Sequence, residues 1–309
     1  MAETTMGRTA AEIASHVATD GDLLLDLERL AVEAAILAGE MIRDERPGDV
    51  TAAATKTSDT DVVTIMDTRS EATLRAHLRR ARPADGFFGE EGTSAASHSG
   101  ITWVVDPIDG TVNYLYGIPL YAVSVAAVVG DPQHAGQWAP LAGAVFAPAL
   151  GALWHAARGR GSFRRDVREA GVRDGSDGVP DQTQVGGCTD LAMGLIGTGF
   201  AYLADERARQ ADIVRALLPD VRDIRRLGSA AVDLCLVADG RLDGYFESGL
   251  RPWDLAAGWL IVTESGGVVR GPAGADPQAE LTIAGNTYVA LALAARVDRA
   301  LDPKVGPSA

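Results

Sequence analysis

The chain of 309 residues contains few residues that bind soft metals or form cross-links: two cysteines and five histidines. Cys188 and Cys235 are too few and too far apart for a zinc site or a disulfide framework. Cys235 lies in a helical apolar pattern and is predicted to be a core thiol. The histidines show no HxH or HExxH spacing, so we interpret all five as structural or surface residues.

Basic residues and long apolar runs are also scarce. Lys and Arg number 28 against 42 Asp and Glu, which gives a net charge of −14. This balance argues against nucleic acid as a partner and favours small molecules and cations. Glu3 and Glu12 interrupt the N-terminus, which therefore reads as neither a secretion signal nor a membrane span. We expect a cytoplasmic protein with no membrane partner, and a flexible N-terminal extension over residues 1–20.

The stretch WVVDPIDGT, residues 103–111, is the feature around which the rest of the chain is organised. Its apolar start predicts a buried strand that ends at Asp106. Asp109 then begins a tight turn, and Thr111 is predicted to be the N-cap of a short segment that runs to Pro119. Two carboxylates therefore stand at a strand end beside a helix N-terminus. Cations can bind the carboxylates while phosphate meets the free amides.

A second acidic feature is GFFGEEG, residues 86–92, in which Glu90 and Glu91 are adjacent. Phe87 and Phe88 before them are predicted to be buried, which makes full solvation of the two carboxylates unfavourable. At about 4 Å and an effective dielectric near 20, their repulsion is roughly 4 kcal/mol. A bound metal would remove this cost.

An upstream window, TKTSDTDVVTIMD, covers residues 55–67 and belongs to a loop that we expect to be mobile and to end in a hairpin-like segment. It contains Lys56 and Asp67. From this window alone, both residues are interpreted as ordinary surface charges.

Hydrophobic periodicity predicts a chain in which helices and strands alternate. The predicted helices are residues 23–43, 68–80, 205–218, 229–238, 252–263 and 287–301. The predicted strands are residues 103–105, 121–129, 141–148, 151–157, 191–197, 223–227, 242–246 and 281–284. The three strands between residues 121 and 157 suggest an antiparallel sheet. Residues 158–187, rich in Gly, Asp and Arg, are the best candidate for a connection between two subdomains.

Seven carboxylates are placed at the ends of predicted elements. They are Asp67, Glu90, Glu91, Asp106, Asp109, Glu247 and Asp254. Any one of them has an ordinary explanation: Asp254, for example, is favoured by the dipole of the helix that begins at Pro252. That explanation does not account for all seven. Oxygen ligands without His or Cys nearby suit Mg²⁺ rather than zinc.

Three segments together resemble the signature motifs of the inositol monophosphatase family. They are GEEG (89–92), WVVDPIDGT (103–111) and WDLAAG (253–258). Lys56 and Asp67 also fall where that family places a lysine and an aspartate. GSAAVDLC (228–235) and YFESGLRPWD (245–254) are similar to the bacterial inositol-1-monophosphatase branch. The resemblance spans about Leu23 to Leu301.

The resemblance implies a fold that layers α+β and α/β parts, an α-β-α-β-α sandwich of the sugar-phosphatase type. It implies an N-terminal α+β subdomain over residues 21–180 with most metal ligands, and a C-terminal α/β subdomain over residues 181–309 that completes the site. It also implies a homodimer that hydrolyses a small phosphorylated cyclitol or sugar with two to three Mg²⁺ ions per subunit, and inhibition by lithium.

The family's site residues carry over onto matching positions of this chain. The first metal corresponds to Glu90, Asp106, the Ile108 carbonyl and Thr111, and the second to Asp106, Asp109 and Asp254. A third, weaker ion lies near Glu90, with Lys56 and Glu91 close to this region. Glu90 and Thr111 are expected to activate a water for in-line attack on phosphorus, and Asp67 to support the Thr111 hydroxyl. Substrate contacts correspond to Asp109, Gly110, Thr111, Gly228, Ala230, Glu247 and Asp254.

The substrate is chosen on weaker grounds, because related enzymes share the metal site and differ around it. Val112, Asn113 and Tyr114 after the central motif look more like inositol monophosphate or fructose bisphosphate enzymes than other branches. We prefer inositol monophosphate, with fructose-1,6-bisphosphatase as the alternative and histidinol-phosphate phosphatase after it. A regulatory interaction protein that uses the same fold is an alternative of another class, which the complete ligand set argues against as the sole role.

Overall fold

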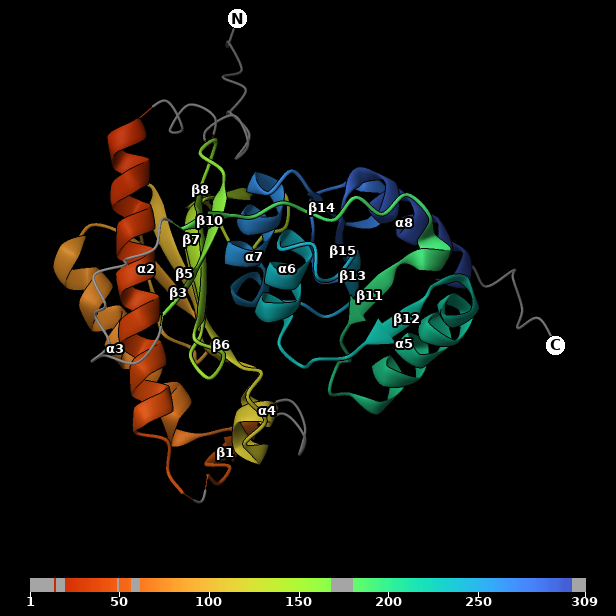
Figure 1. Ribbon diagram of the computed structural model, residues 1–309. Coiled ribbons are helices and arrows are strands. Elements are labelled where there is room, and N and C mark those ends of the chain that lie inside the picture. Colours follow the sequence, from red (N-terminus) through yellow and green to blue (C-terminus); the bar gives the residue numbers. More distant parts are fainter. Residues whose placement is uncertain (1–13, 15–19, 49, 57–61, 168–179, 302–309) are drawn as a thin grey trace, which may run out of the picture.

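The computed structural model describes residue 14 and residues 20–48, 50–56, 62–167 and 180–301. Its elements stack in five layers in which helices alternate with sheets (Figure 1). An outer helix pair covers an eight-stranded sheet, a middle helix pair follows, and a five-stranded sheet is covered by a second outer helix pair. This arrangement confirms the predicted α-β-α-β-α sandwich.

The first outer layer holds α2 (Gly21–Asp44) and α3 (Ile65–Ala81). In α2 the apolar residues recur at helical spacing, so one face packs on the sheet and the other faces water. Both helices start slightly earlier than the apolar period predicts, because side-chain caps set their beginnings. The Asp20 side chain accepts from the Leu23 amide at 3.0 Å, and Thr64 caps α3.

The eight-stranded sheet carries the central motif. Its strands, in spatial order, are β10 (Asp181–Gln182), β9 (Ser162–Asp166), β8 (Ala152–Ala157), β7 (Trp138–Ala147), β6 (Ala122–Gly130), β5 (Ile101–Asp109), β3 (Gly86–Gly89) and β4 (Ser94–Ala95). All neighbours are antiparallel except β3 and β5, which confirms the predicted antiparallel sheet. Helices cover both faces, so β6 and β7 are apolar without alternation. A separate antiparallel pair, β1 (Ala54–Thr55) and β2 (Val62–Val63), precedes α3.

The middle layer consists of α6 (Ala230–Ala238) and α7 (Pro252–Glu264). Both helices are apolar on nearly all sides, as expected for helices that lie between two sheets. Cys235 is fully buried in α6, so the predicted core thiol is confirmed.

The five-stranded sheet has the order β12 (Asp223–Arg225), β11 (Leu195–Thr198), β13 (Gly244–Glu247), β15 (Thr282–Gly285) and β14 (Val268–Arg270). Strand β11 is parallel to both of its neighbours, whereas β15 is antiparallel to β13 and β14. The outer helices on this side are α5 (Ala204–Leu217) and α8 (Thr287–Leu301). Short 3₁₀ turns cover Leu191–Met193, Leu218–Asp220 and Pro272–Gly274.

Several local predictions were wrong. The strand predicted for residues 103–105 runs on to Asp109, because an irregularity in its pairing with β6 lets it pass Pro107. The strand predicted for residues 191–197 begins with a 3₁₀ turn, which the Asp190 side chain caps. Strands β9 and β14 were missed, since β9 is polar and β14 has only three residues.

The segment predicted to connect two subdomains contains β9 and β10, which belong to the first sheet. Its residues 168–179 lie outside the described residues, as do nearly all of residues 1–20 and the end of the chain after residue 301. The division at residue 180 therefore stays a prediction. In the described ranges, no helix has both the length and the apolar character needed to cross a bilayer.

Candidate active site

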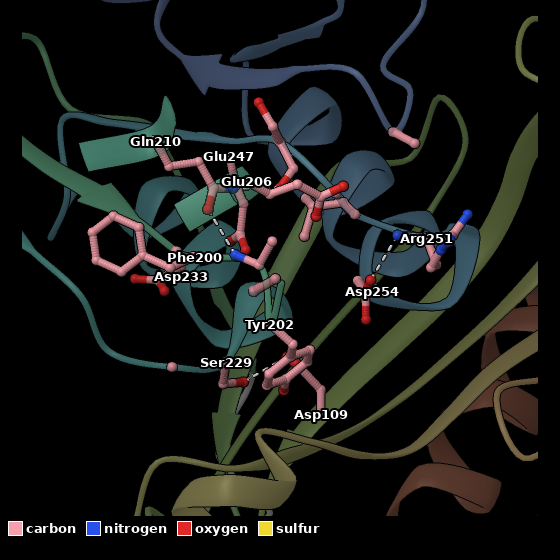
Figure 2. Close-up of a pocket in the computed structure, with 18 of the residues that line it drawn as sticks. Asp109, Phe200, Tyr202, Glu206, Gln210, Ser229, Asp233, Glu247, Arg251 and Asp254 are labelled. Atoms are coloured by element: carbon pink, nitrogen blue, oxygen red, sulfur yellow. Dashed lines mark hydrogen bonds between the residues drawn. The ribbon is translucent and has the colours of Figure 1, made fainter. Parts of the chain in front are cut away.

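A cavity of about 780 Å³ opens where the end of β5, the start of α6 and the start of α7 meet. Its floor is acidic, and its outer wall comes from the loop between β11 and α5 and from α5 itself (Figure 2). The two sheets contribute to it together, so the five-layer fold is what assembles the cavity.

The irregular end of β5 points two carboxylates into this cavity. Asp106 is 1 % exposed and its Oδ1 accepts from the Ile108 amide at 3.0 Å. Asp109 accepts from the Ser229 hydroxyl at 2.6 Å and from the Ala231 amide at 2.7 Å, both at the start of α6. These bonds tie the central motif to the middle helix layer.

The third carboxylate, Asp254, lies in the first turn of α7, where Pro252 opens the helix. Its Oδ2 accepts from the Arg251 amide at 2.6 Å (Figure 2). Oxygens of Asp106, Asp109 and Asp254 all lie within 4.8 Å of one another. The structure thus brings together three ligands that the sequence analysis proposed from two distant motifs.

This cluster is electrostatically unfavourable without a cation. Burial, followed by the charges of neighbouring carboxylates, raises the pKa values of Asp106 and Asp254 well above their usual range. Burial also raises the pKa of Asp109 to about 6. Among the described residues that line the cavity there is no His or Cys, so the donor set is oxygen, as Mg²⁺ prefers. The residues fit a hard divalent cation.

Glu90 and Glu91 lie beside the cluster and share a lysine. Lys56 Nζ is 2.8 Å from Glu90 Oε1 and 2.7 Å from Glu91 Oε1. Burial raises the pKa of Glu90, and Lys56 opposes that shift. Lys56 is exposed, as its interpretation as a surface charge expects, but it is not an ordinary one, because it is the counter-ion of the glutamate pair.

Asp67 was misread as a surface charge, since it is fully buried. Its Oδ2 accepts from the Thr64 hydroxyl at 2.6 Å and the Thr64 amide at 2.8 Å. Burial raises the pKa of Asp67 to about 6, and these bonds oppose the shift. Its other oxygen lies 3.1 Å from the Thr111 hydroxyl.

Thr111 is not the N-cap that the sequence predicted. Gly110 takes that position with a φ of 93°, and Thr111 is the first residue of α4 (Thr111–Tyr116). The Thr111 hydroxyl instead lies 2.9 Å from the Ile108 carbonyl. A Cβ on Gly110 would meet the carbonyl oxygens of Gly228 and Leu120 at 3.0 Å, so the glycine lets the two chain segments approach.

On the far side of the cavity Glu247 ends β13, and the Tyr245 hydroxyl donates to its Oε2. Burial raises the pKa of Glu247 to about 7. Gly228 and Ala230 also line the cavity, as predicted for substrate-contacting backbone. All the proposed metal and substrate positions are therefore brought to one place, while their roles stay predictions.

The residues that line the cavity, and could therefore contact a substrate, differ in two ways from the sequence predictions. Asn113 and Tyr114 do not line the cavity: Asn113 donates to the carbonyls of Leu120 and Leu227, and the Tyr114 hydroxyl to that of Ile42. They serve packing, so they cannot discriminate substrates by contact. Conversely, the sequence analysis missed Asp233, which lines the cavity from α6. Its signal was a lone carboxylate inside the apolar run AAVDLCLVA.

Comparison with known proteins gives consistent results. Residues 24–301 match the model of the inositol monophosphatase family. The chain is 44% identical over 257 residues to the inositol-1-monophosphatase of Mycobacterium leprae, covering 79% of this chain and 80% of that one. It is 39% identical over 261 residues to Nus factor SuhB of Xylella fastidiosa, covering 79% and 86%. The solved structure of Mycobacterium tuberculosis SuhB superposes with a TM-score of 0.73 at 38% identity, covering 90% of this chain and 97% of that one.

Proposed function

The chain belongs to the inositol monophosphatase family, and from this membership we propose that it is a Mg²⁺-dependent phosphomonoesterase that releases phosphate from myo-inositol monophosphate. Its site carries the chemistry that such a reaction needs: a cation-binding acidic floor, a threonine hydroxyl held by a buried carboxylate, and a polar wall for a substrate. Water is the nucleophile, so no covalent intermediate is required.

The observation that carries the proposal is the meeting of Asp106, Asp109 and Asp254. Burying three carboxylates with oxygens within 4.8 Å is costly unless positive charge compensates them. Their raised pKa values report the same cost. A site that keeps three carboxylates buried together despite their repulsion is organised to bind cations.

Two Mg²⁺ ions would be held by these three aspartates together with Glu90 and the Ile108 carbonyl, and a third, weaker ion by Glu90. When bound, the ions supply positive charge that acidifies a water molecule and neutralises charge on the phosphate oxygens. Lithium, which is a small hard cation, is proposed to inhibit by competing for this donor set.

The chain's own residues orient the water. The Thr111 hydroxyl lies between two acceptors, Asp67 Oδ1 and the Ile108 carbonyl, so its single proton points to one of them and its lone pairs are left for the water. Glu90 accepts the proton of the attacking water, and the charge of Lys56 favours the ionised form that this role requires, against the effect of burial. The alkoxide that leaves is protonated by solvent water.

Other residues place the substrate. The amides of Gly110 and Thr111 are proposed to donate to the phosphate oxygens. Glu247 and the backbone of Gly228 and Ala230 are proposed to contact the ring hydroxyls, since all three positions line the same cavity. Asp109 and Asp254 belong to the acidic floor. They are proposed to lie beside the leaving oxygen, between the groups that hold the phosphate and those that contact the ring.

The experiment measures phosphate release from myo-inositol 1-phosphate, fructose 1,6-bisphosphate, histidinol phosphate and 3′-phosphoadenosine 5′-phosphate. Each substrate is assayed with Mg²⁺, with EDTA, and with Mg²⁺ plus Li⁺. We expect Mg²⁺-dependent, Li⁺-sensitive turnover that is fastest with the first substrate. Faster turnover of the second or third would move the assignment to fructose-1,6-bisphosphatase or histidinol-phosphate phosphatase. No turnover of any substrate by folded protein would overturn the proposal.

A second candidate function rests on the name of one relative, Nus factor SuhB of Xylella fastidiosa. A regulatory interaction role could accompany phosphatase activity or replace it. The ligand set of this chain favours retained activity. Folded protein without turnover would instead favour the interaction role.

We further propose that the protein is a cytoplasmic homodimer in which residues 21–180 and 181–309 form two subdomains. Light scattering of the purified chain tests the dimer: a mass near twice the 32.2 kDa of one chain is expected. A monomer mass at micromolar concentration would contradict it.

A further inference from the structure

Asp233 is a buried residue that lines the cavity, and its Oδ1 has no hydrogen-bond donor among the described residues. The residue is 1 % exposed and its Oδ1 makes no hydrogen bond in the described part of the chain. Other described residues also have buried side-chain atoms without partners, but none of those residues lines the cavity. Because buried polar groups are nearly always paired, the missing donor is expected to come from a bound molecule.

Two glycines, one in strand β11 and one directly after it, make room for this carboxylate and for Glu247. Gly197 lies in β11 and Gly199 just after it, so in extended chain both face the same side. A Cβ on Gly197 would lie 3.1 Å from Asp233 Oδ1, and one on Gly199 would overlap the Glu247 carboxylate. The glycines of the sequence GTG, residues 197–199, therefore leave the space that these two carboxylates occupy.

The two carboxylates belong to one wall of the cavity. Tyr245 pairs with Gly197 in the register of β11 and β13, and it fixes Glu247 by donating to Oε2. Gly197 and Gly199 are two residues apart, about 7 Å along an extended chain. Asp233 and Glu247 lie on the side away from Asp254, which belongs to the acidic floor (Figure 2). Because the two carboxylates contact different glycines, they are placed to meet two different groups of a substrate.

We propose, on the basis of the proposed phosphatase function, that Asp233 accepts a hydrogen bond from a substrate hydroxyl different from the one that Glu247 is proposed to contact. Among the ring phosphates that the proposed function implies, Asp233 then determines specificity for those that present this second hydroxyl. Asp233 does not take part in the chemical step. Its role is to reject phosphate esters that leave its carboxylate without a donor, since a site built for a hydroxyl binds analogues lacking it poorly.

The test compares kcat/KM for myo-inositol 1-phosphate and for phenyl phosphate, which has no hydroxyl. Asp233→Leu removes both oxygens at similar volume. We expect a loss of about tenfold or more with the inositol ester, mostly in KM, and a change of less than about twofold with phenyl phosphate. Asp239→Leu is the control, because Asp239, a half-buried aspartate directly after α6, also has a side-chain oxygen without a hydrogen bond, although it lies 3.7 Å from Arg164 and from Arg241 and outside the cavity lining. It should leave the ratio of the two substrates unchanged.

Asp233→Asn supplies a second route in case the leucine variant does not fold. Inositol esters that each lack one ring hydroxyl are compared in a residue-by-hydroxyl cycle: the loss of one of these hydroxyls should cost wild-type protein more than the Asn variant, because an amide oxygen is a weaker acceptor than a carboxylate. Equal losses for both substrates, no loss for either, or a changed Mg²⁺ requirement in the variants would overturn the inference. An Asp233-dependent preference for histidinol phosphate would also overturn it, since the donor would then be an ammonium group. If wild-type protein hydrolyses neither ester, the proposed function itself has failed.

Discussion

At the scale of single residues, Asp106 is the most deeply buried of the three aspartates of the acidic floor. It is 1 % exposed, and burial together with Glu90 and Asp109 raises its pKa. Asp106→Asn keeps the shape and removes the charge. We expect activity with Mg²⁺ to fall by about 10²-fold or more, because the ligand proposed to touch both ions is weakened. Steady-state phosphate release measures the loss.

The fold of the Asp106→Asn protein should survive, since the change also removes repulsion among buried carboxylates. Circular dichroism and thermal unfolding check this. Asp212→Asn, an exposed position on α5, is the control and should keep full activity. Near-normal turnover by Asp106→Asn would refute the assignment of the metal ligands.

Glu247 gives a pH prediction for Mg²⁺-free protein. Its pKa is raised from 4.5 to about 7 by burial, so ionisation is disfavoured in the folded state. Below about pH 4.5 the group is protonated in both states and has no effect. As pH rises towards 7 the folded state loses up to about 3 kcal/mol relative to the unfolded state.

Glu247→Gln should therefore flatten the fall in the free energy of unfolding between about pH 5 and about pH 8. Urea denaturation in EDTA at both pH values measures it. Glu33→Gln, an exposed position on α2, should leave the wild-type slope unchanged. A steeper fall in the free energy of unfolding of the Glu247→Gln protein than in that of wild type would contradict an upward shift of the Glu247 pKa.

The residues that could be found from the sequence are those at ends of strongly apolar segments, such as Asp106 and Asp254. The apolar segments beside them predict where these two residues lie. The pattern around Lys56 and Asp67 did not show their roles, because the ion pair of Lys56 with Glu90 and the contact of Asp67 with Thr111 join residues that are distant in sequence. Asp233 was visible as a lone charge in an apolar helix, but only the structure shows that it faces Gly197 and the cavity.

At the scale of elements, the long helices and the apolar strands follow from periodicity, because burial on one or both faces imposes it. The start of α2 and α3 depends instead on caps at Asp20 and Thr64. The 3₁₀ turn before β11 and the polar strand β9 carry no periodic signal. Backbone hydrogen bonds to neighbouring segments define these two elements, and those bonds cannot be inferred from the pattern of a single sequence.

The packing of α2 on β7 gives an element-scale prediction. Gly39 is buried in α2, and a Cβ there would overlap the ring of Phe146, which is fully buried in β7. Alanine would gain up to about 1 kcal/mol in helix propensity. We nevertheless expect Gly39→Ala to lower the free energy of unfolding by about 1–2 kcal/mol net, because overpacking forces the helix or the ring to move.

Urea denaturation measures the effect of Gly39→Ala, and phosphate release should be retained, since Gly39 does not line the cavity. Gly187→Ala is the control: a Cβ at that position meets nothing within 4 Å. Equal or greater stability of Gly39→Ala would contradict the close approach of α2 and β7.

At the scale of the whole molecule, the site exists only because two sheets and the middle helices meet. Asp106 and Asp109 come from the first sheet and Asp254 from α7, while Glu247 comes from the second sheet. The resemblance of motifs predicted this convergence; composition and periodicity alone did not. Asp109 joins the parts even without a cation, since it accepts from Ser229 and Ala231 at the start of α6.

A cation that binds this shared site should stabilise the folded molecule as a unit. A ligand that binds only the folded state adds about 2.7 kcal/mol at a concentration 100-fold above its Kd. We expect Mg²⁺ to raise the Tm of wild-type protein relative to EDTA. The rise should be largely lost in Asp254→Asn, whose amide oxygen can still accept from the Arg251 amide and so preserve the start of α7. Asp212→Asn should keep the full rise. If Asp254→Asn gains as much from Mg²⁺ as wild type, the stabilising ion binds elsewhere, and the three aspartates do not form the metal site.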